Sequence, residues 1–384
     1  MTGGLGPGAR VGLDATPLLG RRTGVGQYTA GLVRAFAAAP DAPELVLVPF
    51  TWRGAGGLST GGGAGAGVPL GPRVRAGARR VPARALQAAW ARAELPPVEW
   101  LAGRVDLFHA TNFVAPPARR AAVTVTIHDL TYLRFPELVT AASARYRTLV
   151  PRSLARAAVV CTPTAAIAAE VAETYRLPAD RLAVTPLGVD PAWLDATPPG
   201  PEWLDARGLP PRYLLFVGSM EPRKNLPALL AAYRELLAAD RDAPPLVLAG
   251  PPGWGPALDA AGIPADRLVT TGYLDRADLA AVTAGAAAFA FPSIYEGFGL
   301  PPLEAVACGV PVVAADLPVL REVLVDQATF VDPAAPDALA AALAKALADD
   351  GGPGARAARR AHAARFTWEA CAAATLAAWR RAVA

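Results

Sequence analysis

Short apolar runs alternate with longer stretches of helical periodicity along both halves of this 384-residue chain. That alternation is typical of βαβ units, in which a helix carries the chain back between parallel strands. We therefore predict an α/β fold made of two Rossmann-like domains that face each other across a cleft. The expected strands are 10–15, 44–50, 106–111, 123–129, 158–164 and 182–190 in the first half, and 213–218, 246–250, 268–273, 288–293 and 310–315 in the second.

Breaks in this pattern predict the domain organisation. Residues 196–212 combine prolines and glycines that interrupt both the strand and the helix period. We expect a first domain at 1–195, a linker at 196–212, a second domain at 213–365 and a last helix at 366–384. Open parallel sheets bind ligands beyond the carboxyl ends of their strands, so these edges are where functional residues are expected.

Composition excludes several classes of protein. The chain is 53% hydrophobic and 18% charged, so it has enough apolar surface for a large core and is not intrinsically disordered. Its formal net charge of +4 is too weak over this length to indicate nucleic-acid binding. Cys161, Cys308 and Cys371 are widely spaced, which predicts buried free thiols in a reducing cytosol rather than a zinc site or a disulfide framework.

Two observations bear on the cellular compartment. The first ten residues are glycine-rich and have no apolar segment, which predicts that no signal peptide is present. The uncharged run 279–295 is short for a membrane span and contains Gly285 and Pro292. We expect a cytoplasmic protein, with the inner face of the membrane as an alternative location.

The turn after the first strand of the second half carries Arg223 and Lys224. This turn lies at the expected ligand edge of the sheet. A planar guanidinium beside a compact ammonium suits a diphosphate whose leaving oxygen gains charge. The alternative is a solvated basic turn beside a helix N-terminus, but that end of a helix disfavours cations, so we expect an anion to compensate them.

Downstream, a strand leads into a glycine-rich turn and a helix. Glu296 precedes the turn 297–300, two prolines follow, and Glu304 lies eight positions after Glu296. Because proline has no N–H, we expect any phosphate here to be held by amides near Gly299, Leu300 and Leu303. The two carboxylates would repel phosphate, so hydroxyl groups of a ribose and a hexose are their expected targets; the alternative is a pair of solvated glutamates.

These two segments, together with TGVGQY at 23–28 and TIHDL at 126–130, resemble the retaining glycosyltransferases of family four, which have the GT-B architecture. That group contains bacterial mannosyltransferases and relatives of sucrose and glycogen synthases. The four motifs occur in order and span most of the chain. The resemblance implies a nucleotide-sugar domain in the second half, an acceptor domain in the first, and a last helix that crosses back to the first domain.

The resemblance also implies individual roles. Arg223 and Lys224 would bind the donor diphosphate, Glu296 the donor hexose and Glu304 the ribose. The remaining residues expected at the donor are Gly24 and Gly26 of the glycine-rich turn 23–28 and the phosphate turn of Phe298, Gly299 and Leu300.

His128 would lie near the transferred sugar, where it would bind a hydroxyl or stabilise the departing phosphate. A purely structural role for a histidine at a strand end is the alternative, and Asp129 is a candidate partner. The resemblance further implies retention by front-face attack, with the donor phosphate helping to deprotonate the acceptor. The catalytic candidates are therefore Glu296, His128, Lys224 and Arg223.

The function expected from this resemblance is transfer of a hexose, with mannose favoured, to a hydroxyl of a glycan, lipid or small molecule. The donor would be GDP-mannose or a UDP-sugar. Three alternatives stay open: a UDP-N-acetylglucosamine-dependent transferase of secondary metabolism, a GT-B sugar-nucleotide 2-epimerase, and a non-catalytic nucleotide-sugar-binding protein. We expect no separate cofactor.

Three further segments invite a functional interpretation. The D-x-D of Asp240 and Asp242 falls between a helix and a strand, so we expect a solvated turn and no metal. The glycine-rich stretch 54–67 matches G-x-G-x-x-A, but no helix follows, which predicts a surface loop. Residues 73–92 hold six arginines with Val81, Leu86 and Trp90, which suggests contact with anionic lipid; an ordinary solvated helix is favoured instead.

Overall fold

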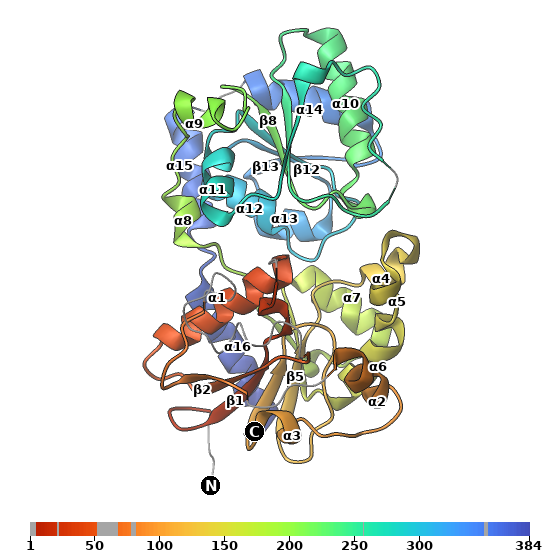
Figure 1. Ribbon diagram of the computed structural model, residues 1–384, viewed down its shortest axis with the longest axis vertical. Coiled ribbons are helices and arrows are strands. Elements are labelled where there is room, and N and C mark those ends of the chain that lie inside the picture. Colours follow the sequence, from red (N-terminus) through yellow and green to blue (C-terminus); the bar gives the residue numbers. More distant parts are fainter. Residues whose placement is uncertain (1–4, 21–22, 52–67, 78–81, 256, 349–351) are drawn as a thin grey trace. The chain divides into compact units, whose positions relative to one another are not determined.

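A computed structural model describes residues 5–20, 23–51, 68–77, 82–255, 257–348 and 352–384. The chain divides into two compact units (Figure 1). Unit 1 comprises Met1–Gly188 and Thr367–Ala384, and unit 2 comprises Val189–Phe366. The division therefore lies between Gly188 and Val189 and between Phe366 and Thr367. Residues 189–212, assigned from the sequence to the first domain and a linker, belong to unit 2 and contain two short helices.

Unit 1 is built on a parallel sheet. Within the described residues it has seven strands in the order β3-β2-β1-β4-β5-β6-β7. Their bounds are β1 (Arg10–Asp14), β2 (Glu44–Val48), β3 (Val74–Ala76), β4 (Leu107–Ala110), β5 (Ala122–Thr126), β6 (Val159–Thr162) and β7 (Leu182–Val184). Six of these were predicted. The edge strand β3 was missed because it is only three residues long and lies in an arginine-rich stretch.

The helices of unit 1 cover its sheet. The longer ones are α1 (Gly24–Ala38), α2 (Ala83–Trp90), α6 (Tyr146–Arg156), α7 (Ala165–Tyr175) and α16 (Trp368–Val383), and the single turns are α3 (Glu99–Ala102), α4 (Thr131–Arg134) and α5 (Ala141–Ala144). Helix α16 packs beside α1 and against β5, β6 and β7, whereas α6 packs on β5 and α7 on β6 and β7 (Figure 1).

The last helix confirms the predicted return to the first domain. Its Trp379 is fully buried and stacks on Phe36 of α1 with 4.7 Å between ring centroids. At its start, Trp368 lies so close to α1 that a Cβ atom on Gly31 would come within 2.2 Å of the indole ring. A residue without a side chain is therefore required where the two helices meet.

Unit 2 is a second parallel α/β unit. Within the described residues its six strands follow the order β10-β9-β8-β11-β12-β13. They are β8 (Leu214–Val217), β9 (Leu246–Ala249), β10 (Leu268–Gly272), β11 (Ala288–Phe291), β12 (Val312–Ala315) and β13 (Ala328–Val331). All but β13 were predicted. Its helices are α8 (Pro191–Leu194), α9 (Pro201–Asp205), α10 (Leu226–Ala239), α11 (Arg276–Ala284), α12 (Leu300–Ala307), α13 (Pro318–Leu324), α14 (Pro336–Ala348) and α15 (Gly352–Ala363).

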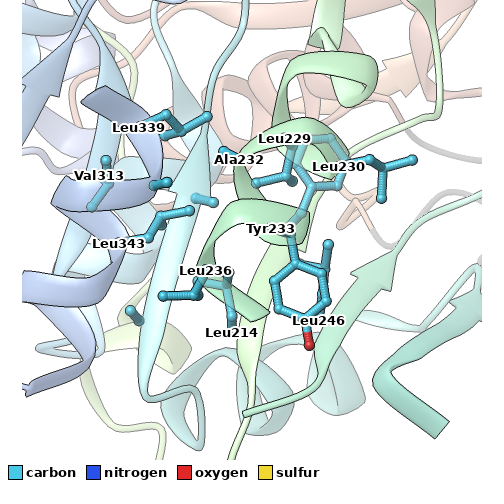
Figure 2. Packing of buried hydrophobic residues seen from close by; sticks show 14 of the residues in the cluster. Leu214, Leu229, Leu230, Ala232, Tyr233, Leu236, Leu246, Val313, Leu339 and Leu343 are labelled. Carbon is cyan, nitrogen blue, oxygen red and sulfur yellow. The ribbon is translucent and has the colours of Figure 1, made fainter. Parts of the chain in front are cut away.

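One core of unit 2 lies between the sheet and helices α10 and α14. Figure 2 shows leucines of both helices, with Tyr233 of α10, packed over the strand residues Leu214, Leu246 and Val313. The hydroxyl of Tyr233 donates to the carbonyl of Pro244 at 3.0 Å, so its polar end is satisfied at the margin of the core. This packing fixes where α10 begins, and hence the turn that carries Arg223 and Lys224.

The arginine-rich segment 73–92 does not form one continuous helix. Arg73 donates to the carbonyl oxygens of Ala39 and Pro40 just after α1, and Arg75 pairs with Glu44. Leu86 and Trp90 of α2 are buried within unit 1, so these two apolar side chains do not face solvent. Val81 and the stretch 54–67 lie outside the described residues.

Two further predictions concern cysteines and membrane spans. All three cysteines are free and buried, as predicted. In the part of the chain that the structure describes, no helix combines the length and the hydropathy needed to cross a bilayer.

Candidate active site

The turn between β8 and α10 holds two basic residues at the carboxyl edge of the sheet of unit 2. Pro222, Arg223 and Lys224 form a single 3-10 turn. Asn225 then takes a left-handed conformation with φ of 56°. Its side-chain amide donates to the carbonyl oxygens of Pro292 at 3.2 Å and Pro333 at 3.0 Å, which ties the turn to the segments after β11 and β13.

Glu296 lies between the two basic side chains. Lys224 Nζ is 2.7 Å from one carboxylate oxygen of Glu296, and Arg223 is 2.9 Å from the other. Arg223 also pairs with Glu221 at 2.8 Å, and it donates to the carbonyl oxygen of Tyr295 at 2.7 Å. Lys224 lies over the Phe291 ring, 4.7 Å from its centroid. The sequence indicated Arg223, Lys224 and Glu296 as site residues but not their pairing, and it did not indicate the roles of Glu221, Tyr295 and Phe291.

Burial makes this network strongly coupled. Lys224 and Glu296 each expose only 7% of their surface. Burial by itself would raise the pKa of Glu296, but the charges of Arg223 and Lys224 lower it to about 2. Burial lowers the pKa of Lys224, and the negative charge of Glu296 offsets part of this shift. The interpretation of a solvated basic turn is therefore wrong: the anion that compensates the two cations is Glu296.

The glycine-rich turn before α12 adopts the strained conformation that only glycine accepts easily. Gly299 has φ of 92°, and a Cβ atom there would lie 2.5 Å from the side chain of Leu320. The amides of Phe298, Gly299 and Leu300 donate no hydrogen bond to any described residue. Leu303 was expected to add a fourth amide, but its N–H donates to the carbonyl oxygen of Gly299 at 3.2 Å. That expectation was wrong because the helix uses this amide itself.

Glu304 is buried in α12 next to a cation that the sequence did not indicate. Arg276, the first residue of α11, lies 3.9 Å from Glu304 and 3.5 Å from Asp190. Burial raises the pKa of Glu304 to about 7, since Arg276 favours its charged form while Asp190 opposes it. Glu304 is therefore not a solvated glutamate. Arg276 lies at the start of α11, which follows the edge strand β10 and packs beside α12, and no sequence motif marks it.

Gly24 and Gly26 lie at the start of α1 in unit 1 rather than in a turn. Thr23 is extended, Gly24 is the first helical residue, and the first helical hydrogen bond runs from the amide of Gln27 to the carbonyl of Thr23 at 2.9 Å. The amides of Gly24, Val25 and Gly26 donate to no described residue. The predicted glycine-rich turn is thus a helix N-terminus, which attracts anions through these groups and its dipole.

His128 follows β5 in unit 1 and is almost fully buried. Its Nε2 lies 2.7 Å from the carbonyl oxygen of Thr111. Because a carbonyl can only accept, Nε2 carries the proton and Nδ1 is an acceptor. Burial lowers the pKa of His128, so the ring is neutral at physiological pH. Asp129 instead accepts a hydrogen bond from the amide of Thr131 at 2.9 Å.

The D-x-D segment forms a turn, as its position between a helix and a strand suggested. The amide of Asp242 donates to the carboxylate of Asp240 at 2.9 Å, directly after α10 ends. Among the described residues, no three side chains of His, Cys, Asp or Glu are grouped so that they could hold a metal ion.

Each half of the chain matches a family model. Residues 205–365 match the family described as "Glycosyl transferases group 1", and residues 22–193 match "Glycosyltransferase Family 4". Among curated proteins, O-antigen chain mannosyltransferase B of Escherichia coli is 34% identical over 289 residues, which cover 71% of this chain and 74% of that protein.

Solved structures match nearly the whole length of the chain. Sucrose-phosphate synthase from Thermosynechococcus elongatus matches with a TM-score of 0.71 and 20% identity, covering 95% of this chain and 96% of that one. Anabaena HepE in complex with UDP-glucose matches with a TM-score of 0.66 and 17% identity, covering 97% and 98%. At these identities the likeness establishes the fold alone.

Proposed function

This chain belongs to family 4 of the glycosyltransferases and has the GT-B fold, and we propose that it transfers mannose from GDP-mannose to a hydroxyl group of a glycan, with retention of configuration. It is a transferase that takes a nucleotide-sugar donor. The mannosyltransferase of E. coli at 34% identity supports mannose as the sugar. The observation that carries the chemistry is the buried network of Arg223, Lys224 and Glu296. It lies in the same unit as the turn at Gly299, whose amides donate to no residue that the structure describes.

The reaction breaks the bond between the sugar C1 and the phosphate oxygen and forms a new bond from C1 to the acceptor oxygen. The proton of the acceptor hydroxyl moves to the departing phosphate oxygen. Arg223 and Lys224 stabilise the charge that develops on this leaving group, and the amides of the turn at Gly299 bind its other oxygens. Because Glu296 holds both cations before the donor binds, they are already oriented and need little reorganisation.

His128, Gly24 and Gly26 belong to unit 1. We assign the N-terminus of α1, with Gly24 and Gly26, to the donor phosphates, because three amides there, which donate to no described residue, suit an anion. We assign Nδ1 of His128 to a sugar hydroxyl. The ring is neutral and its proton is on Nε2, which donates to Thr111, so Nδ1 has no proton to give to the leaving group. This supports hydroxyl binding by His128 over direct protonation of the leaving group.

A panel of nucleotide sugars tests this function. Nucleotide release is measured for GDP-mannose, UDP-glucose and UDP-N-acetylglucosamine, each with and without a glycoside acceptor, and the anomeric configuration of the product is read by NMR. We expect GDP release from GDP-mannose, stimulated by acceptor, and an α-linked product. Release only from UDP-N-acetylglucosamine supports the secondary-metabolism alternative, an epimerised sugar without acceptor supports the 2-epimerase, and binding without release supports a non-catalytic protein.

The affinity for GDP should rise with pH in a way that depends on Glu304. Its pKa is raised to about 7, so the carboxylate forms as the pH rises through that value and then accepts the ribose hydroxyls more strongly. We expect GDP to bind about fivefold more tightly at about pH 8 than at about pH 6. Calorimetric titration of Glu304→Gln should show weaker binding and lose this part of the pH dependence, while the ionisation of GDP itself affects both proteins equally. An identical pH profile in the two proteins contradicts the ribose assignment.

Transferase activity should survive EDTA. Arg223, Lys224 and the turn amides offer the diphosphate charge and hydrogen bonds without a divalent cation. The rate of GDP release is compared before and after chelation, and again after Mg²⁺ or Mn²⁺ is added back. Activity that EDTA abolishes and metal restores contradicts a metal-independent mechanism.

A further inference from the structure

Three neighbouring strands of unit 1 end in polar residues at the carboxyl edge of the sheet. Asp14 ends β1, Thr111 and Asn112 follow β4, and His128 follows β5, with β4 between the other two strands. Thr111 joins them: its hydroxyl donates to the main-chain carbonyl of Asp14 at 2.8 Å, and its own carbonyl accepts from His128 at 2.7 Å. Neighbouring strands are about 4.8 Å apart, and β4 lies between β1 and β5, so about 10 Å separates the strand ends that lead to Asp14 and His128.

The side chains at this edge present hydrogen-bond acceptors. Asp14 exposes only 4% of its surface, and Thr16 hydrogen-bonds to its carboxylate through both the side chain and the amide, the amide donating to Oδ1 at 2.9 Å. Among the described residues, no lysine or arginine forms an ion pair with it, and burial raises its pKa to about 6. Asn112 Oδ1 is buried and accepts from no described residue. Nδ1 of His128 is an acceptor as well.

Aromatic rings and a strained backbone accompany these acceptors. Phe113 is in the left-handed region with φ of 58°, which is costly for a bulky residue and is found where a site requires it. Its ring contacts His128 and Tyr146, with centroids 5.8 and 4.6 Å apart. Burial raises the pKa of Tyr146, and a hydrogen bond with the side chain of Asn112 lowers it in part.

The hydrogen-bond acceptors at this edge indicate which class of ligand would fit. A group that faces Asp14, Asn112 and Nδ1 of His128 must donate hydrogen bonds, as sugar hydroxyls do, whereas a phosphate or carboxylate would bring oxygen lone pairs against oxygen. Aromatic side chains with a few convergent polar groups are also typical of small-molecule sites. The acceptors therefore favour a neutral, hydroxyl-rich molecule over an anionic one.

We propose that Asp14, Asn112 and Tyr146 form an acceptor subsite that binds an uncharged hexose through its hydroxyl groups, with Asp14 as the residue that determines this specificity. The inference rests on the proposed function and names the acceptor class of that reaction. Asp14 would bind one acceptor hydroxyl through its carboxylate. Asn112 would bind a second hydroxyl, and the face of Tyr146 would lie against the sugar ring.

Binding of simple glycosides tests the subsite directly. Methyl α-mannoside, methyl α-glucoside, methyl α-galactoside and the anionic methyl α-glucuronoside are titrated by NMR into the wild type, Asp14→Asn, Asn112→Ala and Asp106→Asn. Asp106 is a matched control, since it also accepts from a backbone amide, that of Arg10 at 2.8 Å, but precedes β4 at the opposite edge of the sheet. We expect a neutral glycoside to bind the wild type and Asp106→Asn equally, and to bind Asp14→Asn and Asn112→Ala roughly tenfold more weakly.

Two further readouts separate this proposal from others. Asp14→Asn keeps an acceptor for the amide of Thr16, and its melting temperature shows whether it folds. GDP affinity, to which none of the three substituted residues is assigned, should be the same in all four proteins, while KM for the acceptor should rise in Asp14→Asn more than kcat falls. The subsite is overturned if no neutral glycoside binds, if the glucuronoside binds as well, or if Asp14→Asn binds within about twofold of wild type. A wild type that binds glycosides but neither binds GDP nor releases it contradicts the proposed function instead.

Discussion

Replacement of Lys224 by alanine should lower turnover by roughly a hundredfold or more, with little change in folding. The ammonium lies 2.7 Å from Glu296 in a buried network, so its charge acts on the leaving diphosphate with little screening by water. Folding should be largely preserved because Arg223, 2.9 Å from the same carboxylate, still neutralises Glu296. The measurements are kcat for GDP release and the melting temperature.

Lys345 provides the matched control for this variant. It is the other lysine of the chain and is exposed on α14. Lys345→Ala should have the turnover of the wild type. A Lys224→Ala variant with near-normal kcat and normal GDP affinity would remove Lys224 from the mechanism, and a variant that unfolds at the assay temperature would show that its role is structural.

Replacement of Glu296 by glutamine should destabilise unit 2 by about 3 kcal/mol, more than the loss of Lys224 does. The amide leaves Lys224 buried without its carboxylate partner. Arg223 keeps only one of its two acidic partners, Glu221. Chemical unfolding of the wild type, Glu296→Gln and Lys224→Ala gives the comparison. Glu202→Gln, at an exposed glutamate of α9, is the control and should be neutral.

The effect of Glu296→Gln should also depend on pH. The folded pKa of Glu296 is about 2, below its ordinary value of 4.5, so the stability that it contributes is complete above pH 4.5 and is lost as the pH falls towards 2. The difference in unfolding free energy between wild type and variant should shrink over that interval. A variant as stable as the wild type at neutral pH would mean that water already solvates the network.

Local sequence predicted most of the architecture. Eleven of the strands were placed by their apolar runs, because a buried parallel strand is apolar on both faces and stands out against its turns. Two strands were missed: β3 has only three residues in an arginine-rich stretch, and β13 has four residues of which only one is buried. The predicted turn at Gly24 is the start of α1, since glycines fit a helix N-terminus as well as they fit a turn.

The sequence by itself determined which residue types stand at the ends of the strands, and thereby the family and the positions of Glu296, Lys224 and His128. Only the tertiary structure decided how these groups are paired. Glu296 and Lys224 are 72 positions apart, and the Arg276 that faces Glu304 has no sequence motif to mark it. The protonated nitrogen of His128 was likewise decided by Thr111, which follows the neighbouring strand β4. The physical reason is that periodicity and turn preferences act over a few residues, whereas burial, pairing and pKa depend on which distant segments the packed sheets bring together.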